Sequence, residues 1–199
     1  MHEKRINLVV EDRLQEEALK KILGSILPKY HIPRVFCKNG RGYIKKKLES
    51  FNQASSITPY LVLTDLDRNP CAPDLIKKWV TDFALHPNLI FRVAVREVET
   101  WLLADRKNFA NFLGVSKDKI LREIESEKFP KQLIVRLAKK SKKRLIREKI
   151  VPRCKYVKVG PEYNSALVEF ILTKWDYKVA AEASNSLSKL ILSLRRFEQ

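Results

Sequence analysis

The sequence has few residues of the kinds that build zinc, redox or disulfide sites. Its three cysteines, Cys37, Cys71 and Cys154, lie far apart and form no C-x-x-C pair, which excludes a zinc ribbon and a thioredoxin-like redox motif. The three histidines form no H-E-x-x-H motif. A small, odd number of cysteines is typical of free thiols in a reducing compartment.

Long hydrophobic runs are also absent. No stretch reaches the roughly 20 apolar residues that a transmembrane helix needs. The apolar stretch at residues 8–10 is much shorter than the apolar part of a signal peptide. No internal repeat or low-complexity segment is visible. We therefore expect a cytoplasmic protein without a membrane partner.

Acidic residues are scarce relative to basic ones. The 199 residues include 40 Lys and Arg against 23 Asp and Glu, which gives a formal net charge of +17. Such an excess attracts polyanions, of which nucleic acid is the commonest. The alternative is a charge surplus that only keeps the protein in solution. The apolar fraction of 45% is ordinary and provides a hydrophobic core. We predict that DNA or RNA is a partner.

Strand-like and helix-like segments alternate from the start of the chain to about residue 114, with a turn expected at residues 39–42. Strands are expected at residues 5–10, 31–37, 60–64 and 89–95. Helices are expected at residues 13–27, 43–51 and 73–85, followed by a helix that contains residues 101–103. This alternation predicts an α/β fold with an open, mainly parallel sheet flanked by helices.

Acidic residues follow two of the predicted strands. Glu11 ends the first, and Asp65 and Asp67 follow the apolar run of residues 60–64, where strand alternation would point both aspartates to one side. If the two strands are neighbours, all three carboxylates share the sheet edge at which ligands bind. Adjacent carboxylates repel each other unless a cation lies between them, and oxygen ligands suit Mg²⁺ or Mn²⁺.

Each acidic motif also has a structural interpretation. Glu11 is favourable near the positive end of a helix dipole, and residues 65–70 can form a polar turn with an Asx hydrogen bond. The coincidence of both motifs at matching strand ends, in a basic protein, favours a metal site.

A second acidic pair, Glu97 and Glu99, follows the strand at residues 89–95. If the strand continues, both side chains share one side. If a helix begins at Glu97, the two side chains diverge by more than a right angle and only one can face the cleft. An acidic helix start is the structural alternative. We expect Trp101 and Asp105 to serve packing and a helix end.

The order of these residues resembles the TOPRIM domain of topoisomerases, primases and OLD-type nucleases, in which a glutamate after the first strand precedes a D-x-D after a later one. The segment E-V-E-T-W-L-L-A-D at residues 97–105 is similar to an uncharacterised TOPRIM-like family, as are residues 160–164 and 184–187. One departure is Asp12, which stands where TOPRIM domains usually have glycine; it would either add a ligand or tighten the turn.

This resemblance implies that Glu11, Asp65 and Asp67 hold Mg²⁺ or Mn²⁺ and that Glu97 and Glu99 are further catalytic acidic residues. It implies metal-assisted hydrolysis of phosphodiesters, in which the ion polarises the phosphate and activates water. It also implies a role in a defence system with an ATPase or other partner protein. Candidate phosphate-binding cations lie near the strand ends. These are Arg13, Arg41, Arg68 and Arg96.

The composition changes after Gly114, which divides the chain into an α/β core (residues 1–114) and a basic helical extension (residues 115–199). Helices are expected at residues 117–129, on both sides of Ser141, at 166–175 and at 179–196, with Asn164 as an N-cap. The segment from residue 128 to 158 is densely basic, and we predict that it binds nucleic acid phosphates rather than forming only a solvated or membrane-surface helix face. Its predicted contacts are Lys139, Lys140, Lys142, Lys143, Arg144 and Arg147. No aromatic platform accompanies this cluster, so neither base stacking nor sequence reading is expected.

Three functions are compatible with these patterns. The first is a divalent-metal-dependent nuclease. The alternative is a non-catalytic nucleic-acid-binding subunit of a larger complex. A small-molecule phosphohydrolase is the third, but a net charge of +17 is more than a small substrate requires.

Overall fold

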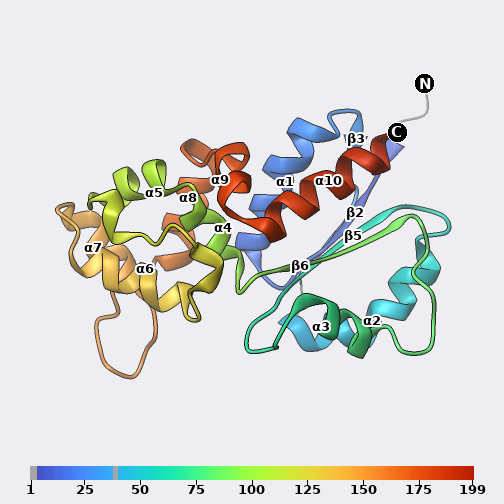
Figure 1. Ribbon diagram of the computed structural model, residues 1–199, viewed down its shortest axis with the longest axis horizontal. Coiled ribbons are helices and arrows are strands. Elements are labelled where there is room, and N and C mark those ends of the chain that lie inside the picture. Colours follow the sequence, from blue (N-terminus) through green and yellow to red (C-terminus); the bar gives the residue numbers. More distant parts are fainter. Residues whose placement is uncertain (1–3, 38–39) are drawn as a thin grey trace. The chain divides into compact units, whose positions relative to one another are not determined.

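The structure is a computed structural model that describes residues 4–37 and 40–199 (Figure 1). The chain forms two compact units, residues 1–95 with 188–199 and residues 96–187. This division differs from the expected boundary at residue 114. The first unit ends directly after its last strand, and the end of the chain returns to it.

The first unit is built on parallel strands. A four-stranded sheet has the order β4-β2-β5-β6, and a two-stranded sheet pairs β1 with β3; every pairing is parallel. The strands are β1 (Lys4–Arg5), β2 (Asn7–Val9), β3 (Tyr30–His31), β4 (Val35–Phe36), β5 (Tyr60–Asp65) and β6 (Leu89–Ala94). The predicted α/β fold with an open parallel sheet is confirmed. The first predicted strand is adjacent to the strand that carries Asp65, since β2 pairs with β5.

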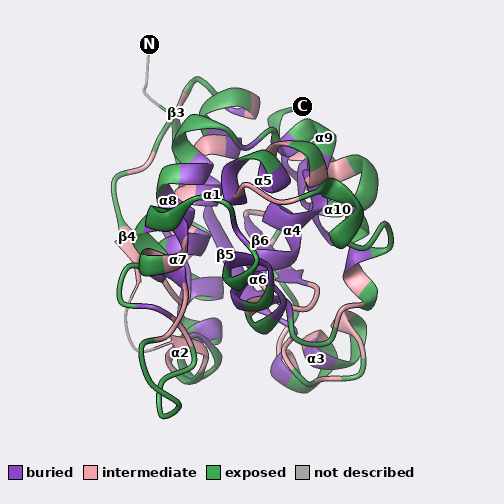
Figure 2. Cartoon of the chain, turned by 90° about the vertical axis from the view of Figure 1, so that its left-hand side faces the viewer, coloured by how far each residue is buried: buried purple, intermediate pink, exposed green. Residues whose placement is uncertain are grey.

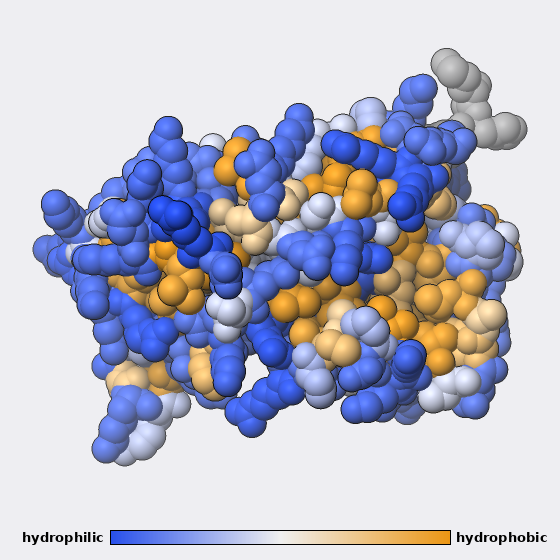
Figure 3. Space-filling model, in the orientation of Figure 1, coloured by the Kyte–Doolittle hydropathy of each residue, from blue (hydrophilic) through white to orange (hydrophobic). Residues whose placement is uncertain are grey.

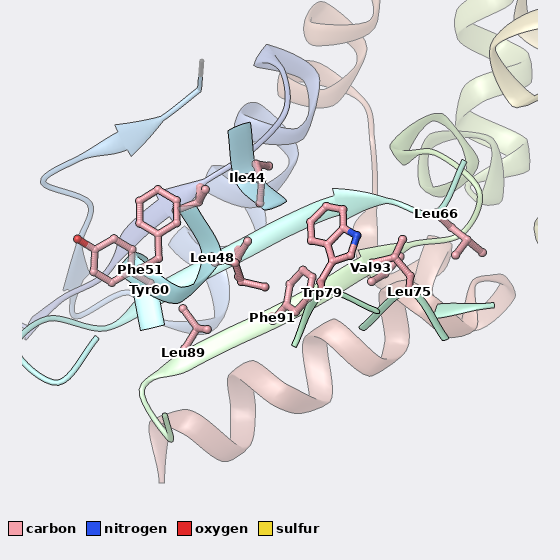
Figure 4. Packing of buried hydrophobic residues seen from close by; sticks show 12 residues of the cluster. Ile44, Leu48, Phe51, Tyr60, Leu66, Leu75, Trp79, Leu89, Phe91 and Val93 are labelled. Carbon is pink, nitrogen blue, oxygen red and sulfur yellow. The ribbon is translucent and has the colours of Figure 1, made fainter. Parts of the chain in front are cut away.

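Helices cover both faces of the four-stranded sheet. They are α1 (Arg13–Ile26), α2 (Gly40–Ala54), α3 (Ala72–Trp79) and the part of α10 (Asn185–Glu198) from Ser188 onward. In Figure 1, α1 and α10 lie on one side of the sheet, and α2 and α3 lie on the other. Figure 4 shows the core on the second side, where Ile44 and Leu48 of α2 and Trp79 of α3 pack against strand residues. Because β5 is buried along its whole length (Figure 2), its apolar run has no polar alternation.

The second unit is helical. Its helices are α4 (Val98–Ala104), α5 (Arg106–Leu113), α6 (Pro130–Lys139), α7 (Arg144–Ile150), α8 (Tyr163–Thr173) and α9 (Tyr177–Ala183), with 3₁₀ turns η1 (Lys117–Lys119) and η2 (Ile124–Ser126). The predicted helix pair around Ser141 is confirmed. Within residues 4–37 and 40–199, no helix is both long and apolar enough to cross a bilayer. Hydrophilic residues cover much of the face that Figure 3 shows, as the composition leads us to expect.

Several predicted boundaries were wrong. Residues 40–42, expected as a turn, begin α2. Gly40, its first residue, takes a left-handed conformation (φ 61°) that glycine adopts without strain, and Asn39 lies outside the described residues. The helix expected at 73–85 ends at Trp79. The helix expected at 117–129 consists of two 3₁₀ turns, and the one expected at 179–196 is broken at Ser184. Helix α8 begins after Glu162, not Asn164.

Candidate functional site

Glu11 and Asp65 come together at the carboxyl edge of the sheet. Glu11 follows β2 and Asp65 ends β5, and the two strands are paired in parallel. Glu11 Oε1 accepts hydrogen bonds from the Asp65 backbone N–H at 2.9 Å and from Thr64 Oγ1 at 2.5 Å. The Asp65 residue is 8% exposed. The sequence therefore predicted correctly that acidic residues from these two strand ends meet.

The start of α1 fixes the positions of both carboxylates. Asp12 is the N-cap of α1, and its carboxylate accepts a hydrogen bond from Gln15 N at 3.0 Å. The Gln15 side chain, which is fully buried, accepts from Glu11 N and donates from Nε2 to Asp65 Oδ1, each at 2.9 Å. Gln15 thus links the Glu11 backbone to the Asp65 carboxylate. Asp12 therefore has a capping role.

Asp67 is held differently from Asp65. Strand β5 ends at Asp65, so the alternation that would align the two side chains does not extend to Asp67, which takes a left-handed conformation (φ 50°) in the following turn. The turn is closed by Asn69, whose backbone N–H and Nδ2 both donate to Leu66 O. The residues after β5 therefore form a polar turn, and the Asx hydrogen bond of the structural alternative stays a prediction.

Arg41 forms an ion pair with Asp67. Its Nη1 lies 2.9 Å from Asp67 Oδ2, and its guanidinium carbon lies 5.3 Å from the centre of the Trp79 ring. The sequence predicted Arg41 as a phosphate contact. In the structure, its charge compensates one of the predicted metal ligands. A phosphate would have to compete with Asp67 for the guanidinium.

The pKa of Glu11 is raised above its ordinary value. Burial of the carboxylate is the largest cause; the hydrogen bonds from Thr64 and Asp65 oppose it, the charge of Asp67 adds to it, and the charge of Arg41 opposes it. The raised pKa means that the negative charge of Glu11 is not fully compensated by its surroundings. A cation bound beside Glu11 would lower the free-energy cost of keeping this carboxylate ionised.

The residues fit a divalent cation in kind but form no complete ligand set. Their donors are hard carboxylate oxygens, which Mg²⁺ and Mn²⁺ prefer. Glu11 Oε2 accepts no hydrogen bond from a described residue, so this oxygen is available to a ligand. Across residues 4–37 and 40–199, however, no three Asp, Glu, His or Cys side chains are grouped closely enough to hold a metal ion. Glu11 and Asp65 are the pair on which a site would be built.

Glu97 and Glu99 belong to the second unit. Strand β6 ends at Ala94 and helix α4 begins at Val98, with Glu97 as its extended N-cap, so the strand does not continue through Glu99 and the helix begins one residue later than the second alternative assumed. Glu97 Oε2 is shielded from solvent and accepts no hydrogen bond from any described residue. Glu99 is 2% exposed; its Oε1 lies 3.3 Å from Lys131 Nζ and 3.3 Å from the Tyr163 hydroxyl. Their predicted catalytic roles stay predictions.

The rest of the E-x-E-x-W-L-L-A-D segment serves structure. Trp101 is fully buried and donates from Nε1 to Ser186 Oγ at 2.8 Å. Asp105 is the N-cap of α5 and also accepts from the Asp176 backbone N–H at 2.8 Å. Ser186 also donates to Glu125 Oε1, from its backbone N–H and its hydroxyl. This confirms packing and a helix end for Trp101 and Asp105.

The predicted nucleic-acid contacts of the second unit divide into two groups. Lys143 donates to the Asn111 and Phe112 carbonyls at the end of α5, Arg147 donates to Ser141 O, and Arg144 pairs with Glu148 on the surface. Three exposed lysines, in contrast, make no side-chain hydrogen bond or ion pair with a described residue. These are Lys139, Lys140 and Lys142. Of the six predicted contacts, these three lysines are the ones whose ammonium groups no described residue engages, so they are the most accessible to phosphates.

The segment after α7 contains an exposed aromatic residue that the sequence analysis overlooked. Tyr156 is 84% exposed, and Lys155 Nζ lies 5.3 Å from the centre of its ring. The base of this loop is closed by hydrogen bonds from Gly160 N to Ile150 O and from Glu162 N to Lys149 O. A Cβ at Gly160 would lie 2.3 Å from Lys149 O, so only glycine allows this close approach. The loop therefore displays a ring and basic groups together.

The remaining candidate cations lie in different surroundings. Arg13 is the exposed first residue of α1, and Arg68 is exposed in the turn after β5. Arg96 begins the second unit and is half-buried. Gln15 and Thr64, which hold the carboxylates, were not predicted. Gln15 stands three residues after Asp12, a spacing that is typical of helix capping and was the available signal.

Comparisons with known proteins give one match. The model of a family described as "Domain of unknown function (DUF4276)" matches residues 10–195. No curated protein and no solved structure matches the chain.

Proposed function

We propose that this chain, which belongs to the DUF4276 family, is a divalent-metal-dependent nuclease that hydrolyses phosphodiester bonds of DNA or RNA. The observation that carries the proposal is the junction of Glu11 and Asp65. Two carboxylate-bearing residues from neighbouring parallel strands are joined there by a hydrogen bond, at the sheet edge where α/β folds bind ligands. The TOPRIM-like motif order and the net charge of +17 support the same function.

The residues of the first unit have distinct roles in this proposal. Asp65 and Glu11 would hold the cation, Mg²⁺ or Mn²⁺. Gln15 orients the Asp65 carboxylate, and Thr64 orients the Glu11 carboxylate. When bound, the cation supplies Lewis-acid activation of the phosphodiester and of the attacking water. Asp67 joins the ligands only if Arg41 releases it, and Arg41 is then free to bind a phosphate oxygen.

The second unit contributes charge and candidate acidic groups. Lys139, Lys140 and Lys142 bind phosphates, and Tyr156 stacks on an unpaired base. Of the two glutamates, Glu97 is the better candidate for a catalytic role, because its Oε2 lacks a partner among the described residues, whereas Glu99 is compensated by Lys131 and Tyr163. A cytoplasmic location, where the three free cysteines stay reduced, and a defence role with an ATPase partner complete the proposal.

The test is cleavage of single- and double-stranded DNA and RNA with and without Mg²⁺ or Mn²⁺. We expect cleavage that requires the cation and is lost in Asp65→Asn. Glu49→Gln, which removes an exposed carboxylate on α2, is the matched control and should cleave normally. Pure metal-supplied protein that cleaves none of the four substrates would refute the proposal.

A non-catalytic nucleic-acid-binding subunit is the second candidate. It is favoured by the ion pair between Arg41 and Asp67, which compensates one predicted ligand without a metal. Thermal unfolding distinguishes the two functions, because a cation that binds the folded state raises the melting temperature. A rise in the melting temperature on adding Mn²⁺ that is absent in Asp65→Asn supports the nuclease. Tight DNA or RNA binding without any cation-dependent shift supports the binding subunit.

A further inference from the structure

A cavity lies at the edge of the sheet opposite to Glu11 and Asp65. Its volume is about 310 Å³, near the lower end of the roughly 300–1,000 Å³ typical of small-molecule pockets. Asn7 and Tyr60, which are paired in register at the starts of β2 and β5, line it. Glu11 and Asp65 lie at the other ends of these strands. Since β5 has six residues, the two edges are about 16 Å apart.

Two arginines give the cavity its charge. Arg5 belongs to β1, and Arg34 precedes β4, where its carbonyl accepts a hydrogen bond from Leu8 N. Both residues are exposed, and neither side chain forms an ion pair with a described residue. No acidic residue lines the cavity. Two arginines that line one space without a counter-charge favour an anion, and the planar donor pairs of their guanidinium groups suit a phosphate.

Asn7 provides the second, independent observation. It is 5% exposed, and its Oδ1 is shielded from solvent and accepts no hydrogen bond from a described residue. A buried polar atom without a partner destabilises the folded state. Because Oδ1 is shielded from the cavity as well as from bulk solvent, a ligand in the cavity can pair with it only after the Asn7 side chain rotates. The amide carries a donor and an acceptor side by side, and rotation about its last torsion lets either one face the cavity.

We propose that this cavity binds a nucleoside monophosphate, with its phosphate between Arg5 and Arg34 and its base edge on Asn7. An asparagine amide matches adenine, which offers an acceptor at N7 beside a donor at N6, so adenosine monophosphate is the expected ligand. Pro33 and Ile57, an isoleucine that is 89% exposed, give the cavity an apolar rim for the ring. The proposal goes beyond the nuclease site and is independent of it.

The binding test uses the full chain in EDTA, so that the cation site cannot contribute. The probes are adenosine monophosphate, inosine monophosphate, ribose 5-phosphate and inorganic phosphate, measured by calorimetry and by thermal unfolding. Adenosine monophosphate should bind at least about tenfold more tightly than inosine monophosphate, which replaces the N6 donor by an acceptor. Equal binding of ribose 5-phosphate or inorganic phosphate would overturn the proposal, as would binding of none of the four.

Two variants locate the site. Asn7→Leu should raise the melting temperature of the ligand-free protein, because it removes the unpartnered amide, and should weaken adenosine monophosphate binding about 10- to 100-fold. Arg34→Gln, at an exposed position that does not endanger folding, should weaken it similarly. Lys46→Gln on the exposed face of α2 is the matched control for loss of charge and should bind normally. Unchanged affinity in both Asn7→Leu and Arg34→Gln would overturn the proposal.

Discussion

Each of the two units contains a carboxylate that is at least partly buried, Glu11 in the first and Glu99 in the second, and the charges around these two carboxylates differ. Glu99 in the second unit is 2% exposed and lies 3.3 Å from both a lysine ammonium and a tyrosine hydroxyl. Glu11 in the first unit receives hydrogen bonds from neutral donors, has carboxylates for neighbours, and has a raised pKa. A carboxylate whose charge is compensated within the fold serves structure, whereas one that is left with an electrostatic cost is a candidate for binding a cation.

The largest expected effect in this comparison is on catalysis. Asp65→Asn removes the buried charge next to Glu11 but retains an oxygen that Gln15 Nε2 can reach. We expect cation-dependent cleavage to fall about 100-fold or more, since even indirect changes around metal ligands cost about 10- to 100-fold. The measurement is the single-turnover rate on the preferred substrate. Wild-type rates in Asp65→Asn would place the chemistry elsewhere.

The next largest expected effect is a difference in the free energy of unfolding between the Glu99→Gln and Glu11→Gln variants. Glu99→Gln weakens charged contacts with Lys131 and Tyr163 and should lower the free energy of unfolding by about 1–2 kcal/mol. Glu11→Gln should leave the metal-free protein equally stable or more stable at pH 7, because it removes a poorly compensated charge and keeps an acceptor for Thr64 and Asp65. Urea unfolding in EDTA compares the variants. If both variants lower the free energy of unfolding by the same amount, the surroundings of Glu11 and Glu99 do not compensate their charges differently.

The pH dependence of this difference follows from the raised pKa of Glu11. Because the pKa of Glu11 is higher in the folded state than in the unfolded state, its ionisation lowers the free energy of unfolding of the protein. This loss develops as the pH rises from the unfolded pKa through the folded pKa. The gain in Glu11→Gln should therefore be present above the folded pKa and vanish as the pH falls toward about 4.5. Melting curves between pH 4 and pH 8 measure it. A gain that grows on acidification would mean that the pKa is lowered instead.

The smallest expected effect concerns the basic residues. Replacing Lys139, Lys140 and Lys142 by glutamine should weaken nucleic acid binding and reduce the slope of log affinity against log salt by about 0.7–0.9 per lost phosphate contact. Fluorescence anisotropy at several salt concentrations measures this slope. The matched control replaces Lys117, Lys119 and Arg122, three basic residues that are also exposed. An equal loss of nucleic acid affinity in both triple variants would indicate that binding depends on the overall positive charge and not on contacts at these three lysines.

The sequence was enough to predict that Glu11 and Asp65 lie at one sheet edge, but not which side chains contact the predicted ligands. The strand-helix alternation and the apolar run of residues 60–64 sufficed to place Glu11 and Asp65 at one sheet edge, because parallel strands align their carboxyl ends. The direction of the Asp67 side chain depends on the end of β5 at Asp65 and on the left-handed conformation of Asp67 itself. Strand periodicity determines neither of these. Its partner Arg41 is 26 residues away in the sequence.

The second unit was harder to predict for a similar reason. Helical periodicity located α6 and α7, but Lys143 and Arg147 look like phosphate contacts in the sequence and form hydrogen bonds to backbone carbonyls in the fold. Glu125 was not singled out, although Ser184 and Ser186, about 60 residues away, bind its Oε1. Contacts between distant segments are set by packing, which no local pattern records.

The most direct measurement is a calorimetric titration of Mn²⁺ into the metal-free wild-type protein and into its Asp65→Asn, Glu11→Gln and Glu49→Gln variants. Binding by Glu11 and Asp65 predicts saturable binding to the wild type and to Glu49→Gln, and at least about a tenfold loss of affinity in each of the other two. Equal Mn²⁺ affinity in all four proteins, or none in the wild type, would contradict a cation site built on Glu11 and Asp65.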